Sequence, residues 1–276
     1  MPTASESAPP VSVAMGVLYR RASTALLRRS VDSILNQSFR DFEFLICDDG
    51  SAEAARRELE RYAAADKRVR LLREGGRLTL PAKLNLCIQN ARGAFVARMD
   101  DDDASRPERF TRQLEALSAS PEIAFVGSNV SLVRDGVTVG KRRLPEYPEV
   151  KDFLMTQPYV HPTLMFRRAA LLAVGGYSED KYCLLCEDYD LLLRLYEAGF
   201  CGWNLQETLL DYTAPDVRGN RTMLHRRNES VTRFRRYRAL GLLPGAFPYV
   251  VKPLAAGLLP GCLLGWAKEH YHQKHG

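Results

Sequence analysis

Four consecutive aspartates, Asp100 to Asp103, are the residues of this sequence best suited to carry out chemistry. They follow the apolar run 94–99, so four carboxylates arrive where a short buried strand is expected to end. In open α/β sheets the ligand binds outside the carboxyl ends of the strands, which is where these acids would lie. Adjacent carboxylates repel one another unless a cation or hydrogen-bond donors offset the repulsion, and hard divalent metals prefer oxygen ligands. The stretch therefore predicts either a metal bound to phosphate or a solvated acidic turn before a helix that starts near Pro107.

Two more acidic clusters follow apolar or turn-rich segments. Asp48 and Asp49 come directly after the apolar run 42–47, again at the expected end of a strand. Glu187 and Asp188 open an expected helix, where the helix dipole favours negative charge, so plain helix-start acids are the alternative. If the three clusters meet, the first could bond a base or ribose, the second could hold a divalent ion on a diphosphate, and the third could take a proton.

Strand and helix patterns alternate up to the four aspartates and predict the framework that positions the acids. Apolar runs that predict buried strands lie at 11–18, 42–47, 69–72 and 94–99. Helical stretches separate them, of which the clearest has an apolar stripe at Leu27, Val31, Ile34 and Leu35. This alternation is typical of a parallel sheet with helices on both faces.

The pattern changes after the aspartates. The elements expected there are a helix at 110–117, strands at 123–127, 159–166 and 207–213, and a hairpin turn at Asp135-Gly136. His161 lies in one of these runs, and a lone histidine beside a strand is more often a structural hydrogen-bond partner than a ligand. No long polar linker divides the chain, so we expect two halves on one sheet, 11–103 and 104–217.

The composition is that of an ordinary globular protein with an excess of positive charge. The 276 residues are 46% hydrophobic, enough for one sizeable core or a core with an appendage. The net charge of +6 suits an anionic partner, which could be nucleic acid, a nucleotide or a membrane surface. Residues 1–10 lack periodicity and predict a disordered lead-in.

Cysteine usage indicates a reducing, cytoplasmic setting. The six cysteines lie mostly in apolar runs, and the N-terminus lacks the charged-then-apolar layout of a secretory signal. Cys183 and Cys186 form a lone C-x-x-C without a second pair, so buried thiols are favoured over a zinc or redox site.

The last segment, 218–276, is basic and then apolar. Its basic part predicts a helix with a sparse apolar edge at Val231, Phe234 and Leu240. The apolar run 247–266 contains three prolines, which a spanning helix tolerates only with compensation. We expect this extension to lie on an anionic membrane surface rather than to cross it, with a solvated surface helix as the alternative. The basic residues are Arg218, Arg221, His225, Arg226, Arg227, Arg233, Arg235, Arg236 and Arg238.

Six ordered motifs resemble those of the family 2 glycosyltransferases, inverting enzymes that use nucleotide sugars. The motifs are VSVAMGVLY, SVDSILNQSFRDFEFLICDDGS, LTLPAKLN, ARGAFVARMDDDD, HPTLMFRR and CEDYDLLLRL, between Val11 and Thr213. Their spacing and order are specific, whereas a single Asp-x-Asp is weak. The resemblance implies the GT-A fold, in which a Rossmann-like nucleotide-binding sheet carries a fused acceptor-side lobe; a helical membrane-associating tail would follow.

The resemblance also implies roles for the residues at the first strand ends. Val17 and Leu18 would line the nucleobase pocket, and Asp49 would bond the base with support from Asp48. The family usually reads Pro-x-Tyr-Asn after its first strand, whereas this chain has Gly16, Val17, Leu18, Tyr19 and Arg20 in that region. Either Leu18 replaces the aromatic residue, or Tyr19 reaches the base through a shift of one residue.

The remaining site residues also come from the resemblance. Asp100 and Asp102 match the family's Asp-x-Asp, in which the last acid holds Mn²⁺ or Mg²⁺ on the donor diphosphate. Asp101 is grouped with the nucleotide-binding residues, although the family often has a small residue there. Asp188 matches the catalytic base. Further candidates for diphosphate, loop or substrate contacts are Lys83, Glu187, His161, Arg218 and His225.

The resemblance implies transfer of a sugar, expected from a UDP-sugar, to a hydroxyl of a glycan or lipid-linked glycan during synthesis of a surface polysaccharide. The expected location is the inner face of the cytoplasmic membrane. A sugar nucleotidyltransferase or a non-catalytic metal- or membrane-binding module is the alternative, and a glycoside hydrolase would need neither nucleotide nor metal. No nucleic acid partner is expected, because the arginine-rich segment lacks interleaved aromatics apart from Phe234 and Tyr237.

Overall fold

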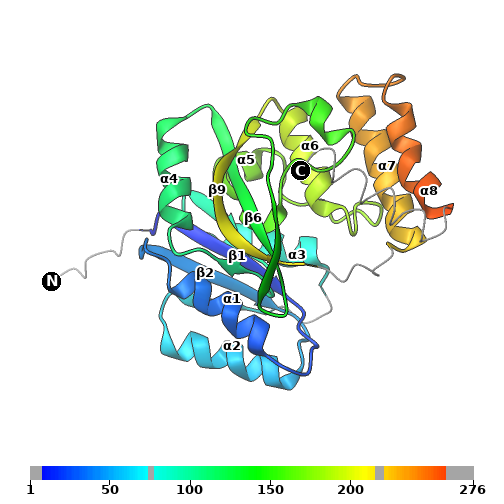
Figure 1. Cartoon of the computed structure of the whole chain (residues 1–276). Helices are drawn as coiled ribbons and strands as arrows, with labels where there is room; N and C mark the ends of the chain where they lie inside the picture. Colours follow the sequence, from blue (N-terminus) through cyan, green and yellow to red (C-terminus); the bar gives the residue numbers. More distant parts are fainter. Residues whose placement is uncertain (1–7, 74–77, 215–220, 259–276) are drawn as a thin grey trace.

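A computed structural model describes residues 8–73, 78–214 and 221–258. Within them, nine strands form one mixed sheet in the order β3-β2-β1-β4-β8-β6-β9-β5, with β7 paired to β6 (Figure 1). The strands are β1 (Val11–Val17), β2 (Phe42–Asp48), β3 (Val69–Leu72), β4 (Phe95–Arg98), β5 (Ala104–Ser105), β6 (Ile123–Arg134), β7 (Val137–Arg142), β8 (Met165–Arg167) and β9 (Cys201–Thr213). The sheet runs through both predicted halves, which are joined where β8 lies antiparallel between β4 and β6.

Helices cover both faces of the sheet, as the alternating pattern predicted. The first apolar core contains residues of α1 (Ala25–Leu35), α2 (Glu53–Ala65) and α4 (Arg109–Ala119). The second contains residues of α3 (Leu80–Asn90), α5 (Arg168–Ala173) and α6 (Glu187–Glu197). Alternation along β1 feeds both cores, because Val13 and Met15 belong to the first and Ala14 to the second. Outside α6 lie α7 (Met223–Ala239) and α8 (Phe247–Leu258), away from α1 and α2 (Figure 1).

The carboxyl ends of the first parallel strands meet at one edge. β1 is parallel to both β2 and β4, and Val17 is paired with Asp48 at the last position of each strand. β4 ends at Arg98, directly before the aspartates. The prediction that two acidic clusters lie at strand ends is therefore confirmed, and the two strands, β2 and β4, lie on either side of β1.

Two strand predictions were wrong in extent. The run 159–166 is not a strand: it contains a 3-10 turn, His161–Thr163, and only its end enters β8. Pro158 and Pro162 explain this, because proline has no N–H to donate to a ladder. β9 starts at Cys201 rather than at residue 207, since residues without an apolar alternation, such as Gly202 and Asn204, still pair with β6.

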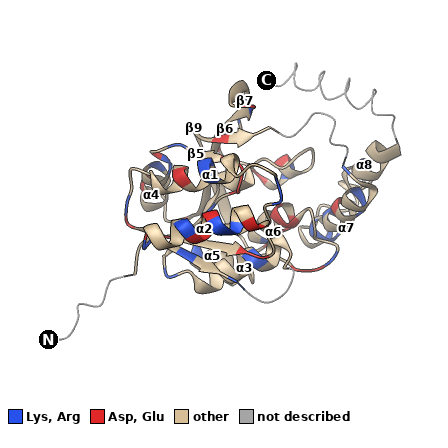
Figure 2. Cartoon of the chain, turned by 90° about the horizontal axis from the view of Figure 1, so that it is seen from below, with Lys and Arg blue, Asp and Glu red and all other residues tan. Residues whose placement is uncertain are grey.

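The basic segment forms α7, but the helix buries other residues than its expected apolar edge. Phe234 is exposed, whereas Asn228, Arg233 and Tyr237 are buried. Arginines are spread along α7 (Figure 2), and part of their charge is neutralised within the protein. The ion pairs are Arg221–Glu229, Arg233–Glu229, Arg235–Asp180, Arg236–Asp190 and Arg236–Glu197.

The predicted membrane tail is described only in part. The apolar run 247–266 forms α8 as far as Leu258, and its remainder lies outside the described residues, as do Arg218 and most of the predicted lead-in. Among the helices that are described, none has the length and apolar character needed to cross a membrane.

Candidate active site

The acid loop, Asp100 to Asp103, is held by α1 and β9. The Ser30 hydroxyl donates to the Asp100 carbonyl at 2.6 Å, and Arg29 Nη2 donates to the Asp102 carbonyl at 3.3 Å. On the other side, the backbone N–H of Thr213 donates to Asp103 Oδ1 at 2.7 Å. These bonds use backbone carbonyls and the Asp103 carboxylate, so the loop is fixed without using the carboxylates of the Asp-x-Asp pair.

Negative charge is concentrated in the acid loop. Burial, Asp100 and Asp102 raise the pKa of Asp101 to about 6. Burial and Asp100 also raise the pKa of Asp102, although a 2.7 Å ion pair with Arg21 acts against this. Arg98, at the end of β4, pairs with Asp100. The crowding of carboxylates is of the kind that a divalent cation relieves.

The donor set of this loop fits a hard cation. Asp100 and Asp102 offer carboxylate oxygens, which Mg²⁺ and Mn²⁺ prefer. Within the described part of the chain, no three His, Cys, Asp or Glu side chains form a ready-made metal site. One or two carboxylates completed by substrate phosphates are the usual arrangement for Mg²⁺, so the loop fits a cation that arrives with a diphosphate.

At the end of β1, Leu18 rather than Tyr19 is available to a ligand. Leu18 is 47% exposed, whereas Val17 and Tyr19 are buried. The Tyr19 hydroxyl donates to the Ser23 carbonyl at 2.9 Å, so this side chain is committed to the turn before α1. In this structure Tyr19 therefore does not take the position of the family's aromatic residue.

The aspartates after β2 are anchored by the loops around them. The backbone N–H of Leu78, just before α3, donates to Asp49 Oδ2. Asp48 accepts from the N–H of Ser51 at 3.3 Å and lies 3.8 Å from the Arg73 guanidinium. Both carboxylates are buried at the strand end, where they are held in fixed positions.

Lys83 lies in the interior beside these aspartates. Its Nζ donates to the Val17 carbonyl at 2.6 Å, and burial lowers its pKa although Asp49 acts against this. Gly16 permits α3 to lie close to β1, because a Cβ at this position would lie only 2.9 Å from the Leu80 side chain. Lys83 thus fixes the end of β1 against α3.

Asp188 is oriented by two hydrogen bonds at the start of α6. Gln157 Nε2 donates to its Oδ2 at 2.9 Å, and the N–H of Tyr189 donates to its Oδ1 at 2.8 Å. Neighbouring Glu187 has a buried Oε2 without a hydrogen-bond partner, and burial and Asp188 raise its pKa. Both oxygens of Asp188 accept a hydrogen bond, whereas one oxygen of Glu187 does not.

The charges of the three acidic clusters act in pairs on two buried side chains. Lys83 is acted on by the charges of Asp49 and Asp101, which belong to the first and second clusters. Tyr177 is acted on by Asp100 and Asp188, which belong to the second and third. Interactions between charges weaken with distance, so residues that share a buried neighbour in this way lie near one another.

The two histidine candidates differ in position. His161 is buried, with Nε2 2.6 Å from the Tyr177 hydroxyl, and burial and Arg98 hold its pKa well below the usual value. It acts as a structural partner of Tyr177 in this structure. His225 lies in the first turn of α7, within the influence of the Asp188 charge, and burial lowers its pKa. α7 therefore begins beside the catalytic candidate.

The sequence interpretation assigned no role to Arg98 or Gln157. Arg98 is 3% exposed, and Asp100 and Tyr177 raise its pKa against the effect of burial. The sequence did carry a signal for Arg98, because it is a cation inside an apolar run and lies two residues before an acid. Gln157 had none, because it reaches Asp188 from 31 residues away.

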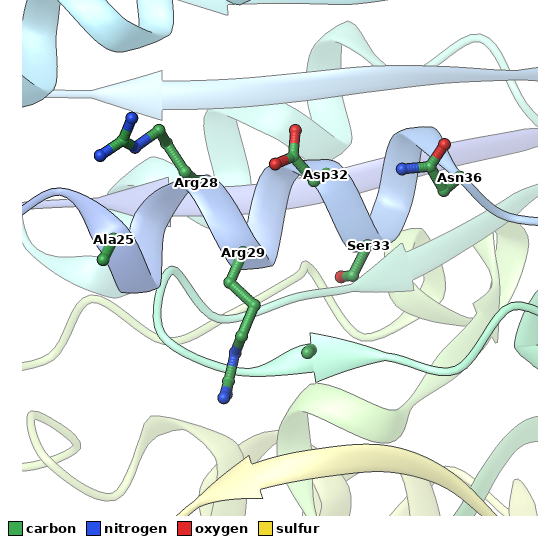
Figure 3. A pocket seen from close by; sticks show the side chains of 7 residues that line it. Ala25, Arg28, Arg29, Asp32, Ser33 and Asn36 are labelled. Atoms are coloured by element: carbon green, nitrogen blue, oxygen red, sulfur yellow. The ribbon is translucent and has the colours of Figure 1, made fainter. Parts of the chain in front are cut away.

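A cavity of about 550 Å³ lies beside α1 and is lined by residues of that helix and by Ala104, which follows the acid loop. Figure 3 shows Arg28 and Arg29 pointing to opposite sides of the helix, so these cations do not converge on one ligand. Because Arg29 holds the Asp102 carbonyl, we interpret this side of α1 as support for the loop.

Loss of the Gln157 amide is expected to lower kcat without changing the KM for the donor. A hydrogen bond to a charged group contributes about 1.5–3 kcal/mol, so Gln157→Ala should reduce kcat roughly tenfold or more. Steady-state kinetics of Gln157→Ala and of the control Gln89→Ala, at an exposed position of α3, test this. A larger effect on donor KM than on kcat would show that Gln157 acts elsewhere.

Comparison with known proteins identifies the class. A mannosyltransferase from Pyrobaculum calidifontis, solved with GDP-Man and Mn²⁺, superposes with a TM-score of 0.62 at 18% identity and covers 96% of this chain and 81% of its own. S. aureus TarS 1–349 in complex with UDP gives a TM-score of 0.67 at 16% identity, covering 91% of this chain and 75% of that one. The curled mixed sheet is thus of the GT-A-like α/β class, as predicted.

The family follows from the sequence comparisons. The model of "Glycosyl transferase family 2" matches residues 17–173. The putative glycosyltransferase EpsE of Bacillus subtilis is 33% identical over 97% of this chain and 95% of its own. The O-antigen biosynthesis glycosyltransferase WbnJ of Escherichia coli is 33% identical over 66% of this chain and 72% of its own. The chain belongs to glycosyl transferase family 2.

Proposed function

We propose that the protein is an inverting glycosyltransferase that moves a hexosyl or N-acetylhexosaminyl group from a UDP-sugar to a hydroxyl of a glycan or lipid-linked glycan, in polysaccharide synthesis. The observation that carries this proposal is that the charges of the first and second acidic clusters act on Lys83 and those of the second and third act on Tyr177. TarS was solved with UDP and with UDP-GlcNAc, and WbnJ is named for O-antigen biosynthesis, which supports the donor and the pathway. Family membership favours transfer over the nucleotidyltransferase and binding-module alternatives.

In this mechanism Asp188 is the only general base, the group that accepts the proton of the attacking hydroxyl. Inversion needs an acceptor hydroxyl to attack the anomeric carbon as the diphosphate leaves from the opposite face, so one proton acceptor is sufficient. The Gln157 amide fixes one Asp188 oxygen, which orients the carboxylate for this proton. Asp49 would accept a hydrogen bond from the nucleobase of the donor, and Leu18 would cover that nucleobase.

Asp102, with Asp100, would hold the divalent cation. When bound, Mn²⁺ or Mg²⁺ offsets the charge that develops on the leaving diphosphate. The residues on either side of the pair are placed to keep it in position: Arg98 pairs with Asp100, and Arg21 pairs with Asp102. Arg21 is half exposed and can move away when a cation arrives.

A panel of nucleotide sugars tests the proposed activity. The protein is incubated with each donor and Mn²⁺, with and without EDTA, and release of the nucleoside diphosphate is measured. We expect release from a UDP-sugar that EDTA abolishes. Release from no donor in the panel, in the presence of acceptor glycans, would contradict the proposal.

We also propose that the protein works at the cytoplasmic face of the membrane through α8. Phe247, Val251 and Leu258 are exposed and share one face of this helix by their spacing. Sedimentation with vesicles of phosphatidylglycerol and phosphatidylcholine should recover the protein. Phe247→Ser with Val251→Ser should reduce recovery several-fold, whereas the equally exposed Leu172→Ser on α5 should not; equal recovery of all three would contradict this role.

A further inference from the structure

A cavity of about 400 Å³ between β6, β7 and β9 carries positive charge that the proposed donor site does not use. These three strands lie side by side (Figure 2). The cavity is lined by Asn129, Lys141, Arg142, Arg143, Gln206 and Thr208. Three of these six residues are cations and none is an acid, so the lining suits an anion.

The cations of this cavity have no carboxylate partners in the described part of the chain. Lys141 and Arg143 are exposed and form no ion pair there. Burial lowers the pKa of Arg142, and the effect that opposes burial comes from a tyrosine hydroxyl, Tyr212, rather than from an acid. On α7, by contrast, Arg233 and Arg236 are paired with acids of the protein. Lys141 and Arg143 are therefore available to a ligand.

The cavity is linked to the proposed active site through Arg142. Arg142 Nη2 donates to the Gln157 carbonyl at 2.9 Å, and the Gln157 side chain donates to Asp188. Tyr212, which acts on Arg142, is itself acted on by the charges of Asp103, Asp100 and Asp102. The cavity is therefore connected to the proposed base through Arg142 and Gln157.

We propose that this cavity binds a phosphate or diphosphate group of the acceptor. The inference rests on the proposed function, since it assigns the substrate class of the same transfer reaction. A guanidinium presents paired N–H donors that match phosphate oxygens, and such charge-assisted bonds are about twice as strong as neutral ones. Anchoring the acceptor by its anionic group would place its sugar hydroxyl next to Asp188.

Binding of small anions tests the cavity without turnover. Titration calorimetry is carried out in EDTA with citronellyl diphosphate, inorganic pyrophosphate, octyl glucuronide and octyl glucoside. The test variant is Lys141→Gln with Arg143→Gln, because both side chains are exposed and Arg142 is retained to hold Gln157. The control is Arg57→Gln with Arg61→Gln, which removes the same charge from exposed positions of α2.

We expect the test variant to bind citronellyl diphosphate at least about tenfold more weakly than wild type, and the control to stay within about twofold. Pyrophosphate that binds as tightly as citronellyl diphosphate would assign the affinity to the phosphates alone; weaker binding would assign part of it to the lipid, and both results support the cavity. Equal losses in the two variants, or no loss in either, would overturn it. Tighter binding of octyl glucuronide than of either diphosphate would show that the cavity prefers a carboxylate, and would overturn the assignment of a phosphate group.

The outcome is separable from that of the nucleotide-sugar panel. Cavity-dependent binding of citronellyl diphosphate together with failure of every donor would remove the proposed function and leave an anion site. Turnover of a UDP-sugar by a protein whose diphosphate binding ignores Lys141 and Arg143 would retain the function and overturn the acceptor assignment.

Discussion

Asp188→Asn is expected to abolish sugar transfer while leaving donor binding nearly intact. The amide has nearly the shape of the carboxylate but cannot accept the acceptor's proton, and loss of a positioned base costs about 10²- to 10⁴-fold in rate. The Asn oxygen can still accept the hydrogen bond from Gln157, while the bond from the Tyr189 N–H is lost. Rates are measured by nucleotide release with an acceptor, and UDP affinity by titration with Mn²⁺.

The matched control is Asp180→Asn. Asp180 precedes α6 and is exposed, and its pairing with Arg235 on α7 is of the surface kind that contributes little. This variant should retain wild-type turnover. If Asp188→Asn turned over at close to the wild-type rate, Asp188 would not be the base; if it lost UDP binding together with activity, its role would be in binding the donor.

Asp102→Asn is expected to remove the effect of metal on donor binding. An amide is a weaker ligand for a hard cation than a carboxylate, and even loss of a residue that only supports a metal ligand costs about 10- to 100-fold in metal affinity. Titration of UDP into wild type should show tighter binding with Mn²⁺ than with EDTA. In the variant, the two affinities should be nearly equal and close to the wild-type value in EDTA.

Asp135→Asn serves as the control for this loss of one negative charge. Asp135 lies in the β6–β7 turn with φ of 50°, a conformation that Asn also adopts, so the substitution should be tolerated. It should preserve the difference between Mn²⁺ and EDTA. A similar difference in Asp102→Asn would mean that the cation is held by other residues.

The sequence predicted the nucleotide-side half well, because local patterns determine it. Apolar runs ending in acids place Asp48, Asp49 and the acid loop at strand ends, and the parallel pairing of β1 with β2 and β4 then brings them to one edge. The stripe of Leu27, Val31 and Ile34 likewise required a helix on one face of the sheet.

The acceptor-side half could not be predicted to the same depth, because its contacts join distant parts of the chain. Gln157 meets Asp188 across 31 residues, and nothing in its neighbourhood distinguishes it from a surface glutamine. Asp135-Gly136 predicted the hairpin correctly, yet not that the end of β7 would carry Arg142 to the Gln157 carbonyl. Such contacts depend on how β6, β7 and β9 pack together.

The basic segment shows how charge in a sequence can be misread without its partners. The expected apolar edge of α7 includes Phe234, which is exposed, while the buried Arg233 is held by Glu229. Lys141 on β7 and Arg143 just after it form no ion pair within the described residues, and the sequence run Lys141 to Arg143 gave no sign of a cavity. Net charge predicted an anionic partner, but only the tertiary structure indicates where it would bind.

The most direct measurement of the central claim is a crystal structure with UDP and Mn²⁺, with the ion located by its anomalous scattering. The account predicts a manganese peak between the diphosphate and Asp102, with the uracil bonded to Asp49 and the diphosphate facing Asp188. A nucleotide bound away from Asp49, or a manganese peak without contact to Asp102, would contradict the claim that these acids serve one donor and one cation.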